Sequence, residues 1–94
     1  MKPYTLSFAQ EAKIRIRHLH PTVKKEIRLA LEELKQNPWE GKILQRELTG
    51  FLSLRVKQYR ILYQFDEEKG HINILTVGVR KTIYEEFSKQ QASK

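Results

Sequence analysis

The chain has 94 residues, with 18 lysines and arginines against 11 acidic residues, which gives a formal net charge of +7. This length allows one domain with a modest core, and a hydrophobic fraction of 39% argues against a disordered chain. The absence of cysteine excludes a disulfide framework and a thiolate zinc site. Such a basic chain favours a polyanionic partner, either nucleic acid, an acidic protein or an anionic membrane surface, although a merely soluble basic protein would share the same balance.

The sequence contains no apolar run near the ~20 residues that a membrane-spanning helix needs, and its first residues lack the apolar core of a secretory signal. We therefore expect a cytoplasmic protein that is not integral to a membrane. No pattern of residues indicates a metal site, and we expect no metal and no other cofactor.

Apolar spacing predicts a strand and two helices in the first third of the chain. Residues 4–8 alternate as a short strand, and Ser7 with Gln10 has the form of a capping box at the start of a helix. That helix should end before Pro21, and the next should begin with Thr22 as its N-cap and end at Asn37. Each helix has one apolar stripe, formed by Ala9, Ala12, Ile16 and Leu19 in the first and by Val23, Ile27, Ala30, Leu31 and Leu34 in the second. Two helices joined by so short a turn should pack as an antiparallel hairpin.

The second half of the chain predicts three strands and a short helix after a loop over residues 39–47. Residues 52–56 and 59–65 alternate apolar and polar side chains, and residues 71–79 are apolar on both faces, which favours a central strand. Thr82 can cap a final helix. The predicted fold class is α+β: one small domain of order βααβββα, with an antiparallel meander sheet and the helical hairpin packed on one face. We expect this domain to span residues 1–87, with a polar tail over residues 88–94.

The stretch from Leu52 to Tyr63 carries three cations, Arg55, Lys57 and Arg60, and no acid. Arginines on the polar face of a sheet indicate either a solvated surface or a site for an anion. Arg80 follows the third strand of the meander, so the predicted fold groups Arg55, Arg60 and Arg80 around one phosphate-sized site.

A series of short motifs in fixed order points to a known family. It includes Leu34–Pro38 at the end of the second helix and Leu48-Thr49-Gly50 before the sheet. The most specific motifs are Leu54-Arg55-Val56, Tyr59-Arg60-Ile61-Leu62-Tyr63, Val77-Gly78-Val79-Arg80 and Tyr84. With the order of elements, these motifs resemble the RelE/ParE toxins of type II toxin–antitoxin systems, and they are closer to the RelE-like mRNA interferase branch. The resemblance extends from Tyr4 to about Phe87.

The resemblance implies a toxin that is a metal-independent endoribonuclease, which cleaves ribosome-bound mRNA and so inhibits translation. Arg60 and Arg80 lie where RelE-like nucleases place arginines that hold the scissile phosphate, a task that suits the planar, permanently charged guanidinium. Tyr84 matches a family tyrosine that stacks on a base or assists proton transfer. The alternative reading is that the arginines are solvated or ion-paired, and that Tyr84 seats the last helix.

Further cations are candidates for contact with RNA. Arg55 and Lys57 belong to the same stretch as Arg60. Lys13 and Arg17 lie on the polar face of the first helix, which is most simply a solvated face, or in a ribosome-dependent nuclease would rest on ribosomal RNA. The chain departs from the family where several RelE nucleases carry lysines on the first meander strand, because residues 51–53 are Phe-Leu-Ser here. The general acid and base therefore stay unassigned.

The resemblance also implies partners. We expect a cognate antitoxin protein, acidic in character, that lays a helix or an extended segment over apolar grooves of the domain. The ribosome and mRNA are the expected targets. Two alternatives are a ParE-like binding protein that poisons DNA gyrase without nuclease activity, and an inactive member that binds only its antitoxin.

Overall fold

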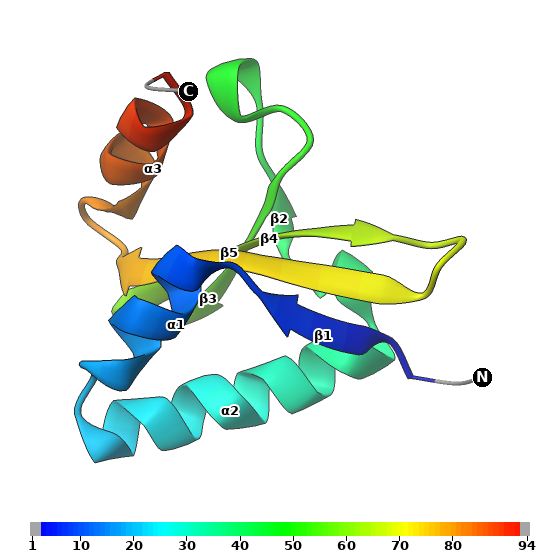
Figure 1. Cartoon of the computed structure of the whole chain (residues 1–94), viewed down its shortest axis with the longest axis horizontal. Coiled ribbons are helices and arrows are strands. Elements are labelled where there is room, and N and C mark those ends of the chain that lie inside the picture. The colour runs from blue at the N-terminus through cyan, green and yellow to red at the C-terminus, as the bar shows by residue number, and fades with distance from the viewer. Residues whose placement is uncertain (1–2, 93–94) are drawn as a thin grey trace.

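The computed structural model describes residues 3–92 and arranges them as a five-stranded sheet with helices on both faces (Figure 1). In chain order the elements are β1 (Thr5–Phe8), α1 (Gln10–Arg17), α2 (Pro21–Gln36), β2 (Lys42–Ile43), β3 (Leu52–Val56), β4 (Tyr59–Asp66), β5 (His71–Val79) and α3 (Ile83–Ala92). Short 3-10 turns, Pro38–Glu40 and Arg46–Leu48, flank β2. Residues 88–92, which we expected in a polar tail, continue α3, and residues 93–94 of that tail lie outside the described part.

The strands lie in the order β1-β5-β4-β3-β2. Strands β3, β4 and β5 form the predicted antiparallel meander, and the α+β class is confirmed. The sheet as a whole is mixed, because β1 joins β5 in parallel and thereby makes β5 an inner strand. Strand β2, within the predicted loop, pairs with β3 over two residues. Both of its side chains are exposed, so it has no apolar alternation from which a strand is recognised.

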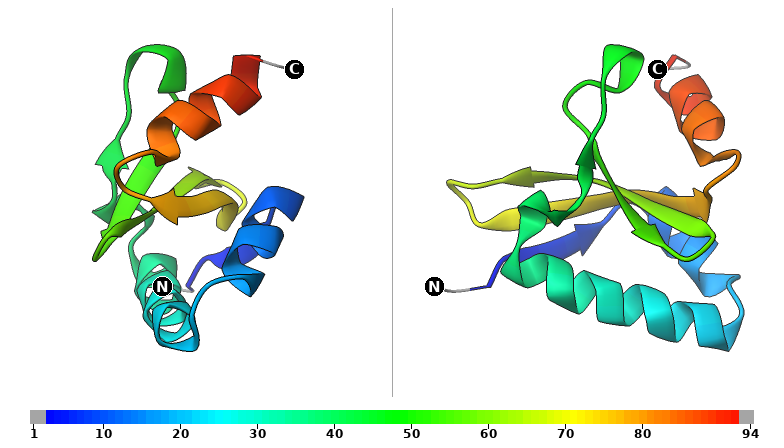
Figure 2. Two further views of the ribbon diagram at one scale, coloured as in Figure 1. Left: turned by 90° about the vertical axis from the view of Figure 1, so that its left-hand side faces the viewer. Right: turned by 180° about the vertical axis from the view of Figure 1, so that it is seen from behind.

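Helices α1 and α2 lie on one face of the sheet and α3 on the other (Figure 2). An apolar cluster accompanies each set of helices. The larger one packs α1 and α2 against the sheet, as predicted for the helical hairpin, and includes Ala12, Ile27, Leu31, Leu34, Leu52, Leu54, Ile61, Tyr63, Ile72, Ile74 and Val77. The smaller one packs α3 and the β2–β3 connection against the other face through Leu44, Leu48, Leu62, Ile83 and Phe87. Polar residues of β3 and β4 lie next to the smaller cluster on the same face of the sheet. They form the candidate site.

Of the three predicted N-caps, Ser7 and Thr22 are wrong, whereas Thr82 directly precedes α3. The N-cap of α1 is Ala9, with no side-chain hydrogen bond, because Ser7 lies within β1 and its hydroxyl donates to Asn73 Oδ1 of β5 at 3.1 Å. Helix α2 begins one residue before Thr22, at Pro21, and its N-cap is His20, whose Nδ1 accepts the Thr22 N–H at 3.1 Å. Proline suits the first turn because it has no N–H to satisfy there.

Candidate functional site

Two rows of residues cross β3, β4 and β5 on the face of the sheet that carries α3. The first row consists of Ser53, Leu62 and Thr76, and the second of Arg55, Arg60 and Gly78. Directly paired residues of antiparallel strands point to the same face. Arg55 and Arg60 therefore project from neighbouring strands on the same side of the sheet, next to the buried Ser53.

A hydrogen-bonded network joins Arg60, Ser53 and Tyr84. The Ser53 Oγ lies 2.9 Å from the Tyr84 hydroxyl, and Arg60 Nη1 donates to the same Oγ at a long 3.5 Å. Ser53 is 1% exposed. The Nε of Arg60 is also buried, and it has no hydrogen-bond partner among the residues that the structure describes. The Nε is therefore an unsatisfied buried donor, and any donors that Arg60 offers to a ligand are those of its Nη groups.

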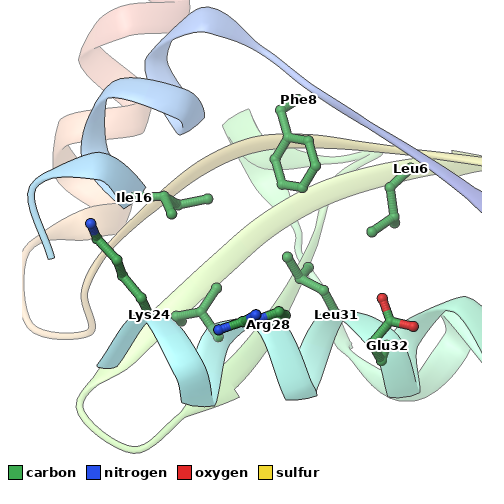
Figure 3. Close-up of a pocket in the computed structure, with 8 residues that line it drawn as sticks. Leu6, Phe8, Ile16, Lys24, Arg28, Leu31 and Glu32 are labelled. Atoms are coloured by element: carbon green, nitrogen blue, oxygen red, sulfur yellow. The ribbon is translucent and has the colours of Figure 1, made fainter. Parts of the chain in front are cut away.

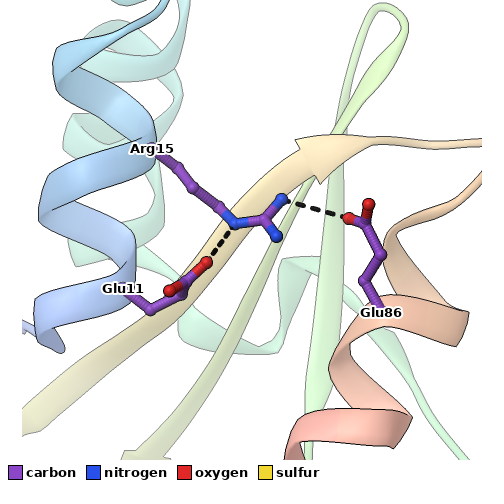
Figure 4. A network of polar contacts seen from close by, with 3 residues as sticks. All are labelled: Glu11, Arg15 and Glu86. Carbon is purple, nitrogen blue, oxygen red and sulfur yellow. Dashed lines mark hydrogen bonds and ion pairs between the residues drawn. The ribbon is translucent and has the colours of Figure 1, made fainter.

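The cationic groups of this face differ sharply in how they are neutralised. Within residues 3–92, no carboxylate oxygen lies within 4.0 Å of the guanidinium of Arg55, Arg60 or Arg80. Arg15 of α1, by contrast, pairs with Glu11 and with Glu86 of α3, the latter at 3.1 Å (Figure 4). The hydrogen bond to Glu11, assisted by that to Glu86, raises the pKa of Arg15 above its ordinary value against the opposing effect of burial. The arginines without carboxylates are the ones available to an external anion.

The end of the β3–β4 hairpin and the exit of β5 form a basic groove of about 700 Å³. Its lining consists of Arg55, Lys57, Gln58, Val79, Arg80 and Lys81, with no acidic residue. The N–H of Arg80 donates to the Gln58 carbonyl at 2.7 Å, which ties the exit of β5 to the hairpin. Arg55 therefore shares the groove with Arg80 and the sheet face with Arg60.

The remaining candidates lie around this centre. The Nζ of Lys57 is 3.3 Å from Glu26 Oε1 of α2, although 76% of the lysine side chain is exposed. Lys13 and Arg17 are exposed on α1, four residues apart and thus on one side of the helix. Tyr84 is half-buried and packs against the smaller apolar cluster. Tyr84 therefore packs α3 against the sheet, and its hydroxyl also takes part in the hydrogen-bonded network with Ser53 and Arg60.

Ser53 is a residue of this site that no sequence motif singles out, since residues 51–53 differ from the lysines of the family nucleases. Its place was nevertheless implied by the alternation of Leu52 and Leu54, which puts residue 53 on the same face as Arg55. The contact with Tyr84 spans 31 residues and has no local signal.

Among residues 3–92, no set of three or more His, Asp or Glu side chains is grouped as metal ligands would be. In the same part of the chain, no helix has the length and apolar character needed to cross a bilayer.

Comparison with known proteins gives the family. Residues 4–84 match the ParE toxins of type II toxin–antitoxin systems. Toxin RelG of Mycobacterium tuberculosis is 37% identical over 84 residues, which cover 87% of this chain and 97% of RelG. The RelBE2 toxin–antitoxin complex of M. tuberculosis contains a chain with a TM-score of 0.76 and 36% identity, over 83% of this chain and 99% of that one. The isolated E. coli RelE toxin gives a TM-score of 0.70 at 26% identity, over 93% and 97% of the two chains. The chain therefore belongs to the RelE/ParE superfamily of type II toxins.

Proposed function

We propose that this toxin is a metal-independent endoribonuclease that cleaves ribosome-bound mRNA in the cytoplasm and thereby inhibits translation. The observation that carries the proposal is the set of arginines without carboxylate partners, Arg55, Arg60 and Arg80, at one end of the β3–β4–β5 meander. Ser53 links one of them, Arg60, to the Tyr84 hydroxyl. The RelE-type relatives support the choice of RNA as the anion.

The reaction is a transesterification within the RNA chain. The 2′-oxygen forms a bond to phosphorus, the bond to the 5′-oxygen breaks, and the proton lost from the 2′-hydroxyl to water is balanced by one gained at the 5′-oxygen. Negative charge builds on the phosphorane oxygens, where the Nη groups of Arg60, of which only Nη1 has a long 3.5 Å contact with Ser53, can donate. In this proposal Arg60 and Arg80 hold the scissile phosphate, and Tyr84 contacts the neighbouring base or assists proton transfer.

The surrounding cations would extend the contact with RNA. Arg55 lies beside Arg60 and lines the basic groove, and its Nε donates to the Lys57 carbonyl at 3.2 Å, which steadies the hairpin. Lys57 itself can turn from Glu26 to a phosphate, because an exposed ion pair is worth no more than about 1 kcal/mol. Lys13 and Arg17 on α1 are exposed and suit phosphates of ribosomal RNA.

A cognate antitoxin is the second partner that we propose, because relatives are found in toxin–antitoxin complexes. A groove of about 490 Å³ lies between β1, α1 and α2 (Figure 3). Its lining is mainly apolar, with Leu6, Phe8, Ile16, Ile27 and Leu31, and α2 adds Lys24, Arg28 and Glu32. An amphipathic segment with acidic residues beside its apolar face fits this lining.

A ParE-like poison of DNA gyrase is the second candidate, and the match to the ParE toxin family favours it. The basic groove would then contact gyrase or its DNA, with no hydrolytic chemistry. An inactive member that binds only its antitoxin is a third possibility, which the replacement of the family lysines at residues 51–53 keeps open.

Growth arrest on expression tests the proposal. Arg60→Ala and Arg80→Ala should each abolish arrest while the purified variants keep the wild-type circular dichroism spectrum. Arrest that persists in both folded variants would remove the assigned site. Arrest that depends on these residues but comes with intact mRNA and double-strand DNA breaks would favour the gyrase candidate instead.

A further inference from the structure

Ser53 connects two side chains that come from distant parts of the chain. Its Oγ lies 2.9 Å from the hydroxyl of Tyr84 on α3 and 3.5 Å from Nη1 of Arg60 on β4. No other side chain of residues 3–92 forms a hydrogen bond with the polar atoms of Arg60 or with the Tyr84 hydroxyl. One buried hydroxyl is therefore the side-chain hydrogen-bond partner that both groups share in the described chain.

The backbone holds Ser53 firmly in place. Strand β3 is paired on both sides at this residue, with Lys42 of β2 and with Leu62 of β4. The side chain is short and 1% exposed, so its hydroxyl has little freedom to move. Arg60, by contrast, has a long side chain. Its ordering costs conformational entropy when an anion binds, and that cost is smaller if a neighbour already holds the side chain in place. A rigid hydroxyl beside the long side chain of an arginine is the arrangement expected of a supporting residue in a preorganised site.

We propose that Ser53 is a positioning residue of the anion site, whose hydroxyl aligns the Arg60 guanidinium and the Tyr84 hydroxyl on one phosphate group. For catalysis this inference rests on the proposed nuclease function, whereas for anion binding it stands on the geometry alone. Ser53 does not touch the substrate in this account. It acts through Arg60 and Tyr84, in the stretch where family nucleases carry lysines.

Thr76 provides a matched control. It lies in the same row of the sheet face as Ser53, is also 1% exposed, and its Oγ1 has no hydrogen-bond partner among the described residues. Ser53→Ala and Thr76→Val each remove one buried hydroxyl from the same face with little change of shape. Only the first removes a contact with Arg60 and Tyr84.

The catalytic test is single-turnover cleavage of mRNA on programmed ribosomes, with concentration series that separate the maximal rate from half-saturation. Ser53→Ala should lower the maximal rate by a factor of roughly two to ten with little change in half-saturation, because the 2.9 Å hydrogen bond with Tyr84 contributes about that much and the longer contact with Arg60 adds less. Thr76→Val should match the wild type. In a Tyr84→Phe background, Ser53→Ala should cost less than it does alone, since part of its effect runs through the Tyr84 hydroxyl. Fully multiplicative effects of Ser53→Ala and Tyr84→Phe would contradict the proposal.

Inorganic phosphate provides a readout that does not depend on nuclease activity. In NMR titrations of the full chain, phosphate should shift the signals of Arg60 and Tyr84. The midpoint concentration of phosphate should be the same for the wild type and for Thr76→Val. It should be several times higher for Ser53→Ala. If the wild type cleaves no mRNA, the proposed function fails and this titration alone decides the role of Ser53. Equal midpoints in all three proteins, or no phosphate-induced shift at Arg60 in the wild type, would overturn the inference.

Discussion

Replacing Arg60 by methionine should lower activity without lowering stability. The Arg60 Nε is buried without a hydrogen-bond partner in the described chain, and no carboxylate there neutralises the guanidinium. An unsatisfied buried donor costs about 1–3 kcal/mol, whereas the single hydrogen bond to Ser53 is long, at 3.5 Å, and correspondingly weak. Methionine keeps the unbranched apolar stem and removes the buried polar atoms. The free energy of unfolding of Arg60→Met should therefore equal or exceed that of the wild type.

The same substitution, Arg60→Met, should strongly lower the rate of catalysis although it does not lower the free energy of unfolding. Loss of one group that stabilises transition-state charge typically lowers the rate by about 100- to 1,000-fold. Lysine at position 60 retains the charge but not the fork, so Arg60→Lys should fall between the wild type and Arg60→Met. The rate of mRNA cleavage on programmed ribosomes measures this effect, and urea unfolding followed by the fluorescence of the single tryptophan, Trp39, measures stability.

Arg15→Met is the matched control, because Arg15 is an arginine of the same neighbourhood whose charge is paired. It should lose the ion pairs with Glu11 and Glu86 and lower the free energy of unfolding by about 1 kcal/mol. The reasoning would be refuted if Arg60→Met were the less stable of the two variants and still cleaved mRNA at the wild-type rate. Arg60 would then be a structural residue.

Three further predictions concern the core and the antitoxin groove. The Tyr63 hydroxyl donates to the Pro38 carbonyl at 2.7 Å and accepts the Gly41 N–H at 3.0 Å, so Tyr63→Phe should lower the free energy of unfolding by about 1–3 kcal/mol at pH 7. Burial raises the pKa of Tyr63 from 10.0 to about 12, so this difference is fully present below pH 10 and should shrink in urea titrations as the pH rises through 12. Gly41→Ala would place a Cβ 2.3 Å from the Tyr63 hydroxyl oxygen, and should lower the melting temperature by less in the Tyr63→Phe background, whereas equal decreases would contradict the steric reason. Arg28→Glu in the groove of Figure 3 should weaken antitoxin binding about tenfold or more in calorimetry without altering stability, and unchanged affinity would remove that groove as the docking surface.

The parts of the fold that local periodicity encodes were predictable from the sequence. The alternation in residues 52–56 and 59–65 identified β3 and β4, and the stripe from Val23 to Leu34 identified α2, because each pattern records one buried face. The parallel pairing of β1 with β5 was not predictable in this way. It depends on contacts such as Thr5 Oγ1 to His71 Nδ1 at 2.7 Å, which join residues 66 positions apart.

The candidate site, like the fold, was predictable from the sequence only in part. The meander predicted Arg55, Arg60 and Arg80 as one group. Arg55 pairs with Arg60 across β3 and β4 and lines a groove with Arg80, and a phosphate site shared by all three stays a prediction. The roles of Ser53 and Arg15 depend on α3, whose packing brings Tyr84 to one and Glu86 to the other. A sequence pattern shows that α3 exists, but it does not show which end of the sheet the helix covers.

Mapping of RNA ends shows whether the site of Arg55, Arg60 and Arg80 cleaves ribosome-bound mRNA. Purified toxin is added to ribosomes programmed with a defined mRNA, and new ends are located by primer extension. The account predicts cuts within the A-site codon for the wild type and none for Arg60→Ala or Arg80→Ala. Intact mRNA with the folded wild-type protein, or wild-type cutting by either variant, would contradict it.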